Sequence, residues 1–395
     1  MLLRRLFMRI AVLTTGRQDW TGLMMVVRAL ADTPDFEPSI LAGGMHGRGG
    51  PIPNALDGHP VAFKLDVLPD GDTGAAVADA AGRMTSAVGA ALEELRPDAL
   101  LVLGDRTETL ASAVAATCLR IPIVHLHGGE ETEGAVDNVC RHALTKLSHV
   151  HFVAHESFAR RLLQMGESPR RVIVAGAPAL DYVRLMPRLD RRAVAARLGL
   201  RSEADWIVCT HHPATLGGPG ATTEAEAVIS ALRTMVESRR MQIIITRPNV
   251  DEGHSELGTR LSRFASEHAG EVLLVDALGA ELYFSVLQHA VAMVGNSSSG
   301  LIEAPLFQLP AVNVGDRQRG RLRGPNVIDV GSGAAAILDG IERAISPETR
   351  QRLVGTTSPY GDGHAAERIV AGLREIGDSL RDCTKAFVAV EEKLA

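Results

Sequence analysis

Short apolar runs alternate with amphipathic stretches along most of the chain. In the first half, apolar runs that predict buried strands lie at 9–15, 99–105, 121–127, 149–154 and 171–178. Apolar residues at helical spacing predict helices at 22–32, 75–96 and 107–120. Alternation of strand and helix is typical of a parallel sheet that is covered by helices on both faces.

The same pattern restarts after residues 183–200. The second set of predicted strands lies at 206–213, 241–249, 272–278, 290–300 and 310–316, with a helix near 223–239. A chain of 395 residues is also long for a single hydrophobic core. We therefore expect an α/β fold with two Rossmann-like, doubly wound domains. The expected limits are 1–185 and 186–363, and 364–395 contains a helix that packs back on the first domain.

Composition narrows the classes of partner. The net charge is −6 and aromatic residues make up 4% of the chain, which argues against nucleic-acid binding. The four cysteines are scattered, so neither a disulfide framework nor a zinc site is expected, and a reducing cytoplasm is the natural location. Arginines interrupt the first apolar run, and no uncharged run is long enough to span a membrane.

Polar clusters follow the ends of seven predicted strands. They are TTGRQD (14–19), GDRTE (104–108), HLHGGE (125–130), THHP (210–213), TRPN (246–249), GNSSSG (295–300) and GDRQRGR (315–321). Ligands of open parallel sheets bind outside the carboxyl ends of the strands. The repeated placement therefore predicts that these clusters build a ligand site.

The segment 126–146 has the densest chemistry. A double glycine and Glu130 lead into a helix on which Asp137 and Arg141 are four residues apart and within pairing reach. The expected buried stripe of this helix is Val136, Cys140, Ala143 and Leu147. A capped surface helix would explain the acidic first turn. The glycine turn and the alternating His125 and His127 favour an acid/base site instead.

Each of the other clusters allows a structural and a functional interpretation. Arg17 is either solvated or binds an anion beside a helix N-terminus, and Asp105 is either a helix N-cap or a functional carboxylate. His212 is either a half-buried histidine or a phosphate ligand. The serines at 297–299 favour an anion at a helix N-terminus, and Glu303 is placed to accept hydrogen bonds from a ribose diol.

Four long motifs carry a resemblance to a known family. GDRTETLASAVAA, HLHGGEETEGAVDNVCRHALTKLSH, GNSSSGLIEAP and GDRQRGRLRGPNVIDV resemble the hydrolysing UDP-N-acetylglucosamine 2-epimerases of sialic and legionaminic acid biosynthesis, over roughly residues 8–375. The resemblance implies a GT-B type fold, in which two Rossmann-like domains face a cleft. It also implies no metal, no cofactor, and a homodimer or homotetramer.

The resemblance implies an elimination followed by a hydration. A base removes the proton at C2 while the nucleoside diphosphate leaves C1, and water then adds to the 2-acetamidoglucal to release the free manno-configured sugar and UDP. The implied catalytic residues are Asp105, Glu130, Asp137, His127 and His212. The implied substrate-binding residues are Arg17, Asp19, His46, Arg106, Arg141, Asn249, Asp251, Tyr283, Phe284, Ser297, Ser298, Ser299, Glu303 and Arg317.

The chain departs from the family pattern at one point of the catalytic segment. Many relatives have a glutamate where His127 stands, so either Glu130 or His127 takes that role. The substrate is expected to be UDP-N-acetylglucosamine or UDP-2,4-diacetamido-2,4,6-trideoxyglucose, and a GDP-linked sugar is also open. The alternatives are a non-hydrolysing 2-epimerase, a glycosyltransferase on the same fold and a non-catalytic protein that binds nucleotide sugars.

Overall fold

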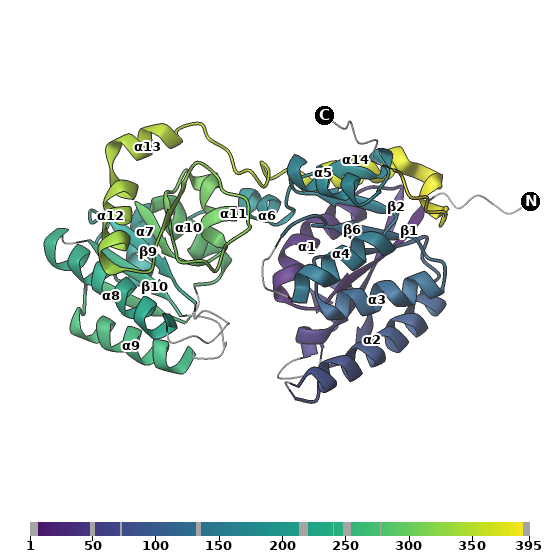
Figure 1. The fold of residues 1–395 in the computed structure, drawn as a ribbon, viewed down its shortest axis with the longest axis horizontal. Coiled ribbons are helices and arrows are strands. Elements are labelled where there is room, and N and C mark those ends of the chain that lie inside the picture. The colour runs from purple at the N-terminus through teal and green to yellow at the C-terminus, as the bar shows by residue number, and fades with distance from the viewer. Residues whose placement is uncertain are drawn as a thin grey trace, which may run out of the picture. The chain divides into compact units, whose positions relative to one another are not determined.

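The chain forms two compact units. The computed structural model (Figure 1) describes residues 7–47, 52–71, 73–131, 136–212, 220–239, 241–247, 254–276 and 278–389, and for 17–18, 220–222 and 254–257 it describes the backbone alone. Unit 1 comprises residues 1–184 and 360–395, and unit 2 comprises residues 185–359. The sequence analysis predicted that the first domain ends at residue 185 and the second at residue 363.

Unit 1 is built on one sheet whose strand order is β3-β4-β2-β1-β5-β6-β7-β8. Only β3 runs antiparallel to its neighbour among the pairs described. The strands are β1 (Met8–Thr14), β2 (Phe36–Gly43), β3 (Ala55–Leu56), β4 (His59–Leu65), β5 (Ala99–Leu103), β6 (Ile123–Leu126), β7 (Val150–Val153) and β8 (Val172–Val174). The helices are α1 (Arg17–Ala31), α2 (Gly74–Leu95), α3 (Thr107–Cys118), α4 (Val136–Leu147), α5 (Glu156–Gln164), α6 (Ala179–Leu185) and α14 (Ala365–Ile376), with 3₁₀ turns η1 (Gly44–Gly47), η2 (Pro169–Arg171) and η4 (Gly377–Arg381).

Strand β1 shows why helices cover both faces of this sheet. Ile10 and Val12 belong to the apolar core that includes residues of α1 and α14, whereas Ala11 and Leu13 belong to the core under α2, α3 and α4. Successive side chains of a strand point to opposite faces, so a continuous apolar run supplies two cores at once.

Unit 2 repeats this architecture with a six-stranded parallel sheet of order β11-β10-β9-β12-β13-β14. The strands are β9 (Trp206–Thr210), β10 (Gln242–Thr246), β11 (Val272–Val275), β12 (Ala292–Gly295), β13 (Ala311–Val314) and β14 (Val327–Val330). The helices are α7 (Arg191–Leu198), α8 (Gly220–Arg239), α9 (His254–Glu267), α10 (Ala280–His289), α11 (Ser299–Ile302), α12 (Ala334–Ile345) and α13 (Pro347–Leu353), with the 3₁₀ turn η3 (Ala304–Phe307). The expected fold class, α/β with two doubly wound domains, is confirmed.

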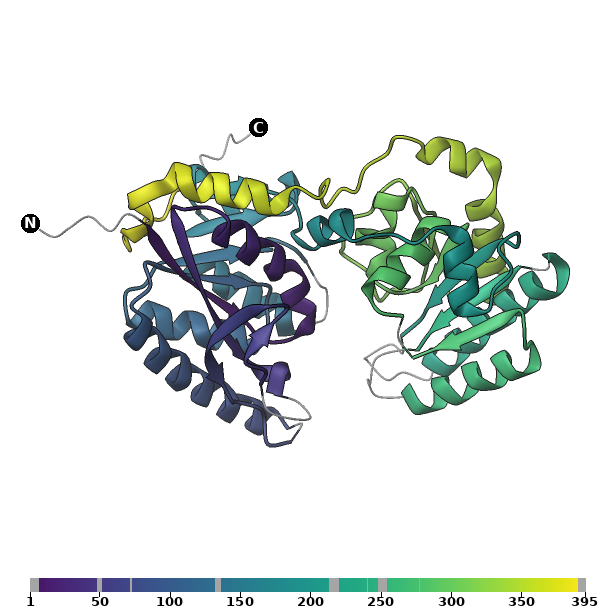
Figure 2. The same ribbon diagram turned by 180° about the vertical axis from the view of Figure 1, so that it is seen from behind.

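The final helix α14 lies beside α1, as Figure 2 shows in yellow and purple. The carboxylate of Asp181, on α6, accepts hydrogen bonds from the backbone N–H groups of Ala365 and Ala366 at 2.8 and 2.7 Å. These are donors of the first turn of α14, which have no partner inside their own helix. Asp181 therefore ties the start of α14 to the first segment of unit 1.

Several predicted elements end earlier or begin earlier than the sequence indicated. β5, β6 and β9 stop before the polar residues that follow them, so Asp105, His127 and His212 lie in loops. Helix α1 begins at Arg17, five residues before the predicted 22. In each sheet the strand order reverses direction beside β1 or β9, where ligands of doubly wound sheets bind.

Candidate active site

Asp19 holds the loop that links β1 to α1. Its carboxylate accepts hydrogen bonds from the backbone N–H groups of Thr15 and Gly16, at 2.7 and 3.0 Å, and from the hydroxyls of Thr14 and Thr15, both at 2.9 Å. These four bonds occupy both carboxylate oxygens. Asp19, which sequence analysis assigned to substrate binding, shapes the turn in this structure.

His46 lies on the neighbouring turn η1 and joins the same network. The hydroxyl of Thr14 donates its single proton to Asp19, so it accepts the hydrogen bond that joins it to Nε2 of His46, at 2.9 Å. The ends of β1 and β2 are thereby connected at the edge where the predicted polar clusters gather.

Asp105 lies in the loop between β5 and α3, where its carboxylate forms an ion pair with Arg141 of α4. The N-cap of α3 is Arg106, and it makes no side-chain capping bond, so the interpretation of Asp105 as an N-cap is wrong. Arg106 pairs with Glu108 at 3.6 Å. Asp105 is thus a functional candidate that a cationic side chain from another helix holds in place.

Arg141 is buried, with 5% of its side chain exposed. One guanidinium nitrogen, Nη2, reaches Asp105, and the other, Nη1, donates to the carbonyl of Glu130 at 2.6 Å. A planar guanidinium can hold two acceptors in fixed directions. Arg141 therefore connects the loop after β5 with the loop after β6.

The turn after β6 pairs His127 with Glu130. Nδ1 of His127 donates to Oε1 of Glu130 at 2.5 Å, and about a fifth of the His127 side chain is exposed. Gly129 has a φ of 79°, and a Cβ at this position would lie 2.6 Å from the carbonyl oxygen of Phe158. Only glycine fits there, which gives the double glycine of the sequence a structural reason.

Helix α4 presents a different face to the core from the one predicted. Val136, a member of the predicted stripe, is 74% exposed, and the buried residues of α4 are Cys140, Arg141, Leu144 and Thr145. The prediction is confirmed for Cys140 and wrong for Val136, because the buried face includes Arg141, which reaches acceptors on two loops. Asp137 lies at the surface of the first turn. Nearby protein atoms partly exclude water from its carboxyl, which raises the pKa, and the positive charge of Arg106 only partly offsets this rise.

His125, which the sequence analysis counted toward an acid/base site without assigning it a catalytic role, is fully buried beneath these loops. Its Nε2 donates to the carbonyl of Gly104 at 2.8 Å, and burial lowers the pKa of the imidazole to about 3, so the ring is neutral. A Cβ on Gly128 would lie 3.2 Å from Nδ1 of His125. The ring thus packs between the peptide that precedes Asp105 and the glycine turn.

In unit 2, the buried Asn296 links the ends of three strands. Its side chain accepts from the N–H of His212 at 2.7 Å and donates to the carbonyl of His212 at 2.9 Å. The carbonyl of Asn296 accepts from Arg317 at 3.0 Å and from Gln318 at 2.8 Å. His212 and Arg317 are therefore brought together through a residue that the sequence analysis did not select, although it lies in the GNSSSG motif.

The serine turn leads into a single helical turn, α11, because Pro305 follows closely. Ser298 occupies the N-cap, and Ser297 Oγ accepts from the N–H of Ser299 at 3.3 Å. Ser299 accepts from the hydroxyl of Tyr283 at 2.7 Å. Burial raises the pKa of that phenol, so it remains a donor.

Glu303 follows α11 and is enclosed by protein. Burial raises the pKa of its carboxyl, and within the described part of the chain no donor reaches its Oε2. A buried acceptor without a donor is costly and points to a missing hydrogen-bond partner. Phe284, by contrast, is a core residue that stacks on Phe307 with 6.3 Å between ring centroids.

A second histidine–glutamate pair lies at the end of β9. His211 is buried and pairs through Nε2 with Glu224 of α8 at 3.3 Å, and Glu224 accepts from Ser332 at 2.6 Å. Burial raises the pKa of Glu224, but the bonds from His211 and Ser332 outweigh it and lower the pKa below its ordinary value. The adjacent histidines of THHP thus have different surroundings, which spacing alone did not reveal.

Some predicted site residues cannot be placed. Asn249 and Asp251 lie outside the described residues, and so does the side chain of Arg17. Arg247 is described and pairs with Asp276 at 2.6 Å.

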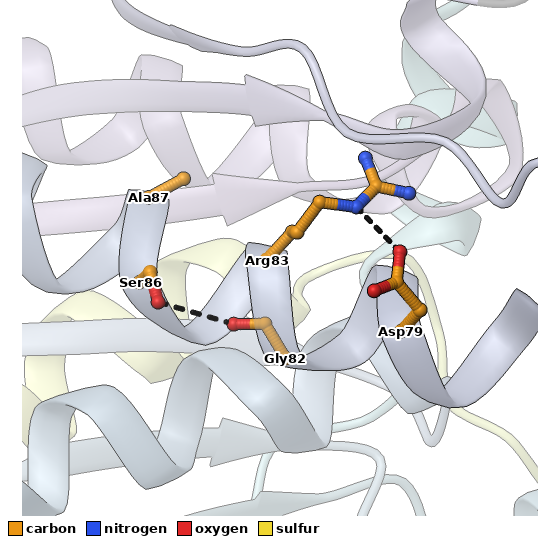
Figure 3. Close-up of a pocket in the computed structure, with 5 residues that line it drawn as sticks. All are labelled: Asp79, Gly82, Arg83, Ser86 and Ala87. Atoms are coloured by element: carbon orange, nitrogen blue, oxygen red, sulfur yellow. Dashed lines mark hydrogen bonds and ion pairs between the residues drawn. The ribbon is translucent and has the colours of Figure 1, made fainter.

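A hollow of about 600 Å³ lies on the outer face of α2 (Figure 3). Asp79 and Arg83 beside it pair with each other at 2.8 Å, and Ser86 donates to the carbonyl of Gly82. It is distant in sequence from every predicted cluster. Among the residues that the structure describes, no group of three His, Cys, Asp or Glu side chains is arranged to hold a metal ion, and no helix has the length and apolarity needed to cross a membrane.

Comparison with known proteins shows the family to which this chain belongs. A family model described as UDP-N-acetylglucosamine 2-epimerase matches residues 28–374. The chain belongs to this family. The GDP/UDP-N,N'-diacetylbacillosamine 2-epimerase (hydrolyzing) of Campylobacter jejuni is 33% identical over 81% of this chain and 84% of its own length. The UDP-N,N'-diacetylbacillosamine 2-epimerase (hydrolyzing) of Legionella pneumophila is 34% identical over 93% and 96%.

Solved structures of 2-epimerases have the same fold. The UDP-N-acetylglucosamine 2-epimerase of Neisseria meningitidis, solved with UDP-N-acetylglucosamine bound, matches with a TM-score of 0.79 at 19% identity, over 93% of this chain and all of that one. The expected GT-B type of fold, the family and its hydrolysing 2-epimerase activity are confirmed.

Proposed function

We propose that this chain hydrolyses UDP-N,N'-diacetylbacillosamine, which is UDP-2,4-diacetamido-2,4,6-trideoxyglucose, and inverts its C2. The products are UDP and the free manno-configured sugar, a precursor for nonulosonic acids. The observation that carries the proposal is a set of groups in unit 1: Asp105, His127 and Glu130 lie on two adjacent loops, and Arg141 of α4 binds both loops. The two hydrolysing relatives support the choice of sugar.

The chemistry needs proton transfer on the sugar and stabilisation of the departing diphosphate. We assign proton transfer to unit 1, where Asp105 and Asp137 add carboxylates to the His127–Glu130 pair. The raised pKa of Asp137 suits a group that must both bind and release a proton. Arg17, at the start of α1, would bind the phosphates beside a helix N-terminus.

We assign nucleotide binding to unit 2. Glu303 has an enclosed carboxylate oxygen that can accept from a ribose hydroxyl, and Ser297 and Ser298 would contact phosphate. His212 and Arg317, which Asn296 joins, would contact the sugar or the diphosphate. We also propose a homodimer or homotetramer in the cytoplasm, where nucleotide sugars are made.

Incubation with three nucleotide sugars tests the proposal. UDP-N,N'-diacetylbacillosamine, its GDP analogue and UDP-N-acetylglucosamine are supplied separately, and NMR follows the released sugar and nucleotide. We expect the highest kcat/KM with the UDP-linked diacetamido sugar. Preference for UDP-N-acetylglucosamine would overturn the substrate, retention of UDP on the product would indicate the non-hydrolysing reaction, and no turnover of any of them would overturn the function.

The variants Asp105→Asn and Asp137→Asn separate an enzyme from a binding protein. We expect both to lose turnover while calorimetry still detects UDP binding. Wild-type chain that binds UDP but releases none from any nucleotide sugar would favour the non-catalytic alternative.

A further inference from the structure

His127 and Glu130 form one unit rather than two independent groups. The Nδ1–H of His127 donates to Oε1 of Glu130 at 2.5 Å, and both side chains are largely but not fully buried. The bond uses the carboxylate oxygen that faces the ring. Sequence analysis left open whether His127 or Glu130 handles the proton, and this contact shows that the two must be considered together.

The backbone around the pair is held at both ends. Arg161 of α5 donates to the carbonyl of Gly129, and Arg141 of α4 donates to the carbonyl of Glu130 at 2.6 Å. The N–H of His127 donates to the carbonyl of Phe152 on β7 at 3.1 Å. Three neighbouring elements therefore fix the turn that carries the pair.

His127 adopts a backbone conformation that residues other than glycine rarely adopt. Its φ is 65°, in the left-handed region, which costs about 1–2 kcal/mol for an L-residue. A histidine retained in such a conformation, on a turn held by two arginines, indicates that the orientation of its ring matters. Strained residues of this kind cluster at active sites.

The carboxylate also selects the tautomer of the ring. With the proton held on Nδ1 by Glu130, the lone pair of the neutral imidazole is on Nε2. A nitrogen base oriented by a carboxylate is an arrangement that suits general-base catalysis. Glu130 is itself engaged by the ring, so it suits a supporting role better than direct proton transfer.

On the basis of the proposed function, we infer that His127 is the base that removes the proton from C2 of the sugar and that Glu130 is its positioning residue. Nε2 takes the proton, the electron pair of the C2–H bond forms the C1=C2 double bond, and the pair of the C1–O bond leaves with the nucleoside diphosphate. Glu130 stabilises the imidazolium, which then returns its proton to solvent.

The hydration uses other groups. The oxygen of water bonds to C1, a carboxylate takes the proton that this water releases, and a protonated carboxyl supplies the new proton at C2 from the opposite face. We assign these two roles to Asp105 and Asp137. The charged groups around the pair are Arg141 with Asp105, and Arg161 with Glu131, while His125 below is neutral.

The test is chemical rescue in the full-length chain. His127→Gly removes the imidazole and relieves the left-handed conformation, so the variant should fold. We expect release of nucleoside diphosphate to fall about 10³-fold, within the range of general-base catalysis. We expect imidazole in the buffer to restore at least about tenfold of that loss. Glu130→Gln should lose about 10–100-fold in kcat with little change in KM, because the ring keeps its acceptor and loses the charge.

Hydration of separately supplied 2-acetamidoglucal provides the second measurement. His127→Gly should hydrate it at a rate close to that of wild type, since the inferred base acts only in the elimination. His142→Gln is the matched control, because His142, on α4, also pairs with a glutamate, Glu131 at 3.3 Å. It should keep the wild-type rate and show no response to imidazole.

Three outcomes would overturn the inference. These are elimination by His127→Gly within about tenfold of wild type, no rescue by imidazole, or a loss in Glu130→Gln as large as that in His127→Gly. Each applies only if wild-type protein releases nucleoside diphosphate. If it does not, the proposed function fails instead, and the two failures are distinguished in the same assay.

Discussion

His125, on β6, donates from Nε2 to the carbonyl of Gly104, 2.8 Å away at the end of β5. This places a buried imidazole directly under the peptide that leads to Asp105. Burial lowers the pKa of His125 to about 3, so the ring is neutral near pH 7. The bond is therefore a permanent support of the loop and not a pH switch.

Replacing His125 by leucine should reduce turnover. The carbonyl of Gly104 would lose its buried donor, which costs about 1–3 kcal/mol, and the loop could shift the Asp105 carboxylate. We expect kcat to fall about 10–100-fold with KM nearly unchanged. His125→Gln, whose amide nitrogen can reach the same carbonyl, should recover most of the rate. Equal losses in the two variants would show that volume, and not the hydrogen bond, matters.

Replacing Arg141 by lysine should impair catalysis more than nucleotide binding. An ammonium cannot hold both Asp105 and the carbonyl of Glu130 in the directions that the guanidinium fixes. We expect kcat to fall about 100-fold while the affinity for UDP, measured by calorimetry, stays within about twofold. Arg83→Lys is the control, because the exposed Arg83–Asp79 pair on the outer face of α2 should tolerate the change. Loss of UDP affinity in Arg141→Lys would contradict the division of roles.

Replacing Glu303 by glutamine should weaken UDP binding. If its enclosed oxygen accepts from the ribose, the affinity for UDP should fall about tenfold, since hydrogen bonds to charged groups contribute about 1.5–3 kcal/mol. Wild type and variant should bind 2',3'-dideoxy-UDP equally. A similar loss for both nucleotides would show that Glu303 does not contact the diol.

Glu303→Gln should also increase the stability of the ligand-free protein, although it weakens UDP binding. The pKa of Glu303 is raised in the folded protein, so the unfolded state ionises first and stability falls as pH rises above about 4.5. Glutamine does not ionise, so the variant does not lose stability in this way as pH rises. We expect the Tm of ligand-free Glu303→Gln, relative to wild type, to rise between pH 5 and pH 8. A constant difference across that range would contradict burial of a costly carboxylate.

The C-terminal segment should stabilise unit 1 through Glu167. This buried carboxylate contacts Lys146 at 2.8 Å, Lys385 at 2.7 Å and His151 at 3.0 Å. Burial alone would raise its pKa, but the three hydrogen bonds outweigh burial and lower the pKa to about 2. Its contribution is therefore complete above about pH 4.5 and is lost as pH falls toward 2.

Glu167→Gln tests this contribution by denaturant unfolding. We expect a loss of about 3 kcal/mol at pH 7, because the pKa of Glu167 is lowered from 4.5 to about 2, and a smaller loss near pH 3. Lys385→Met should lose part of the same stability, since it removes one of the three donors. A loss that does not depend on pH would show that packing rather than charge is responsible.

The sequence by itself determined the layers of both sheets and the location of the chemistry. Apolar runs of β1, β5, β6 and β9 are local patterns, and polar residues just after them lie at the carboxyl edge in any parallel sheet. The long motifs also determined the family. These features are readable because each depends on residues that are close along the chain.

The tertiary structure decided which side chains meet. Helical spacing predicted a pair between Asp137 and Arg141, and the structure pairs Arg141 with Asp105 instead. The register of β5 and β6, with Leu103 opposite Leu126, brings the loop of Asp105 beside the glycine turn. Spacing shows which residues share a helix face, whereas a partner on another loop depends on strand register and on the direction that burial forces on a side chain.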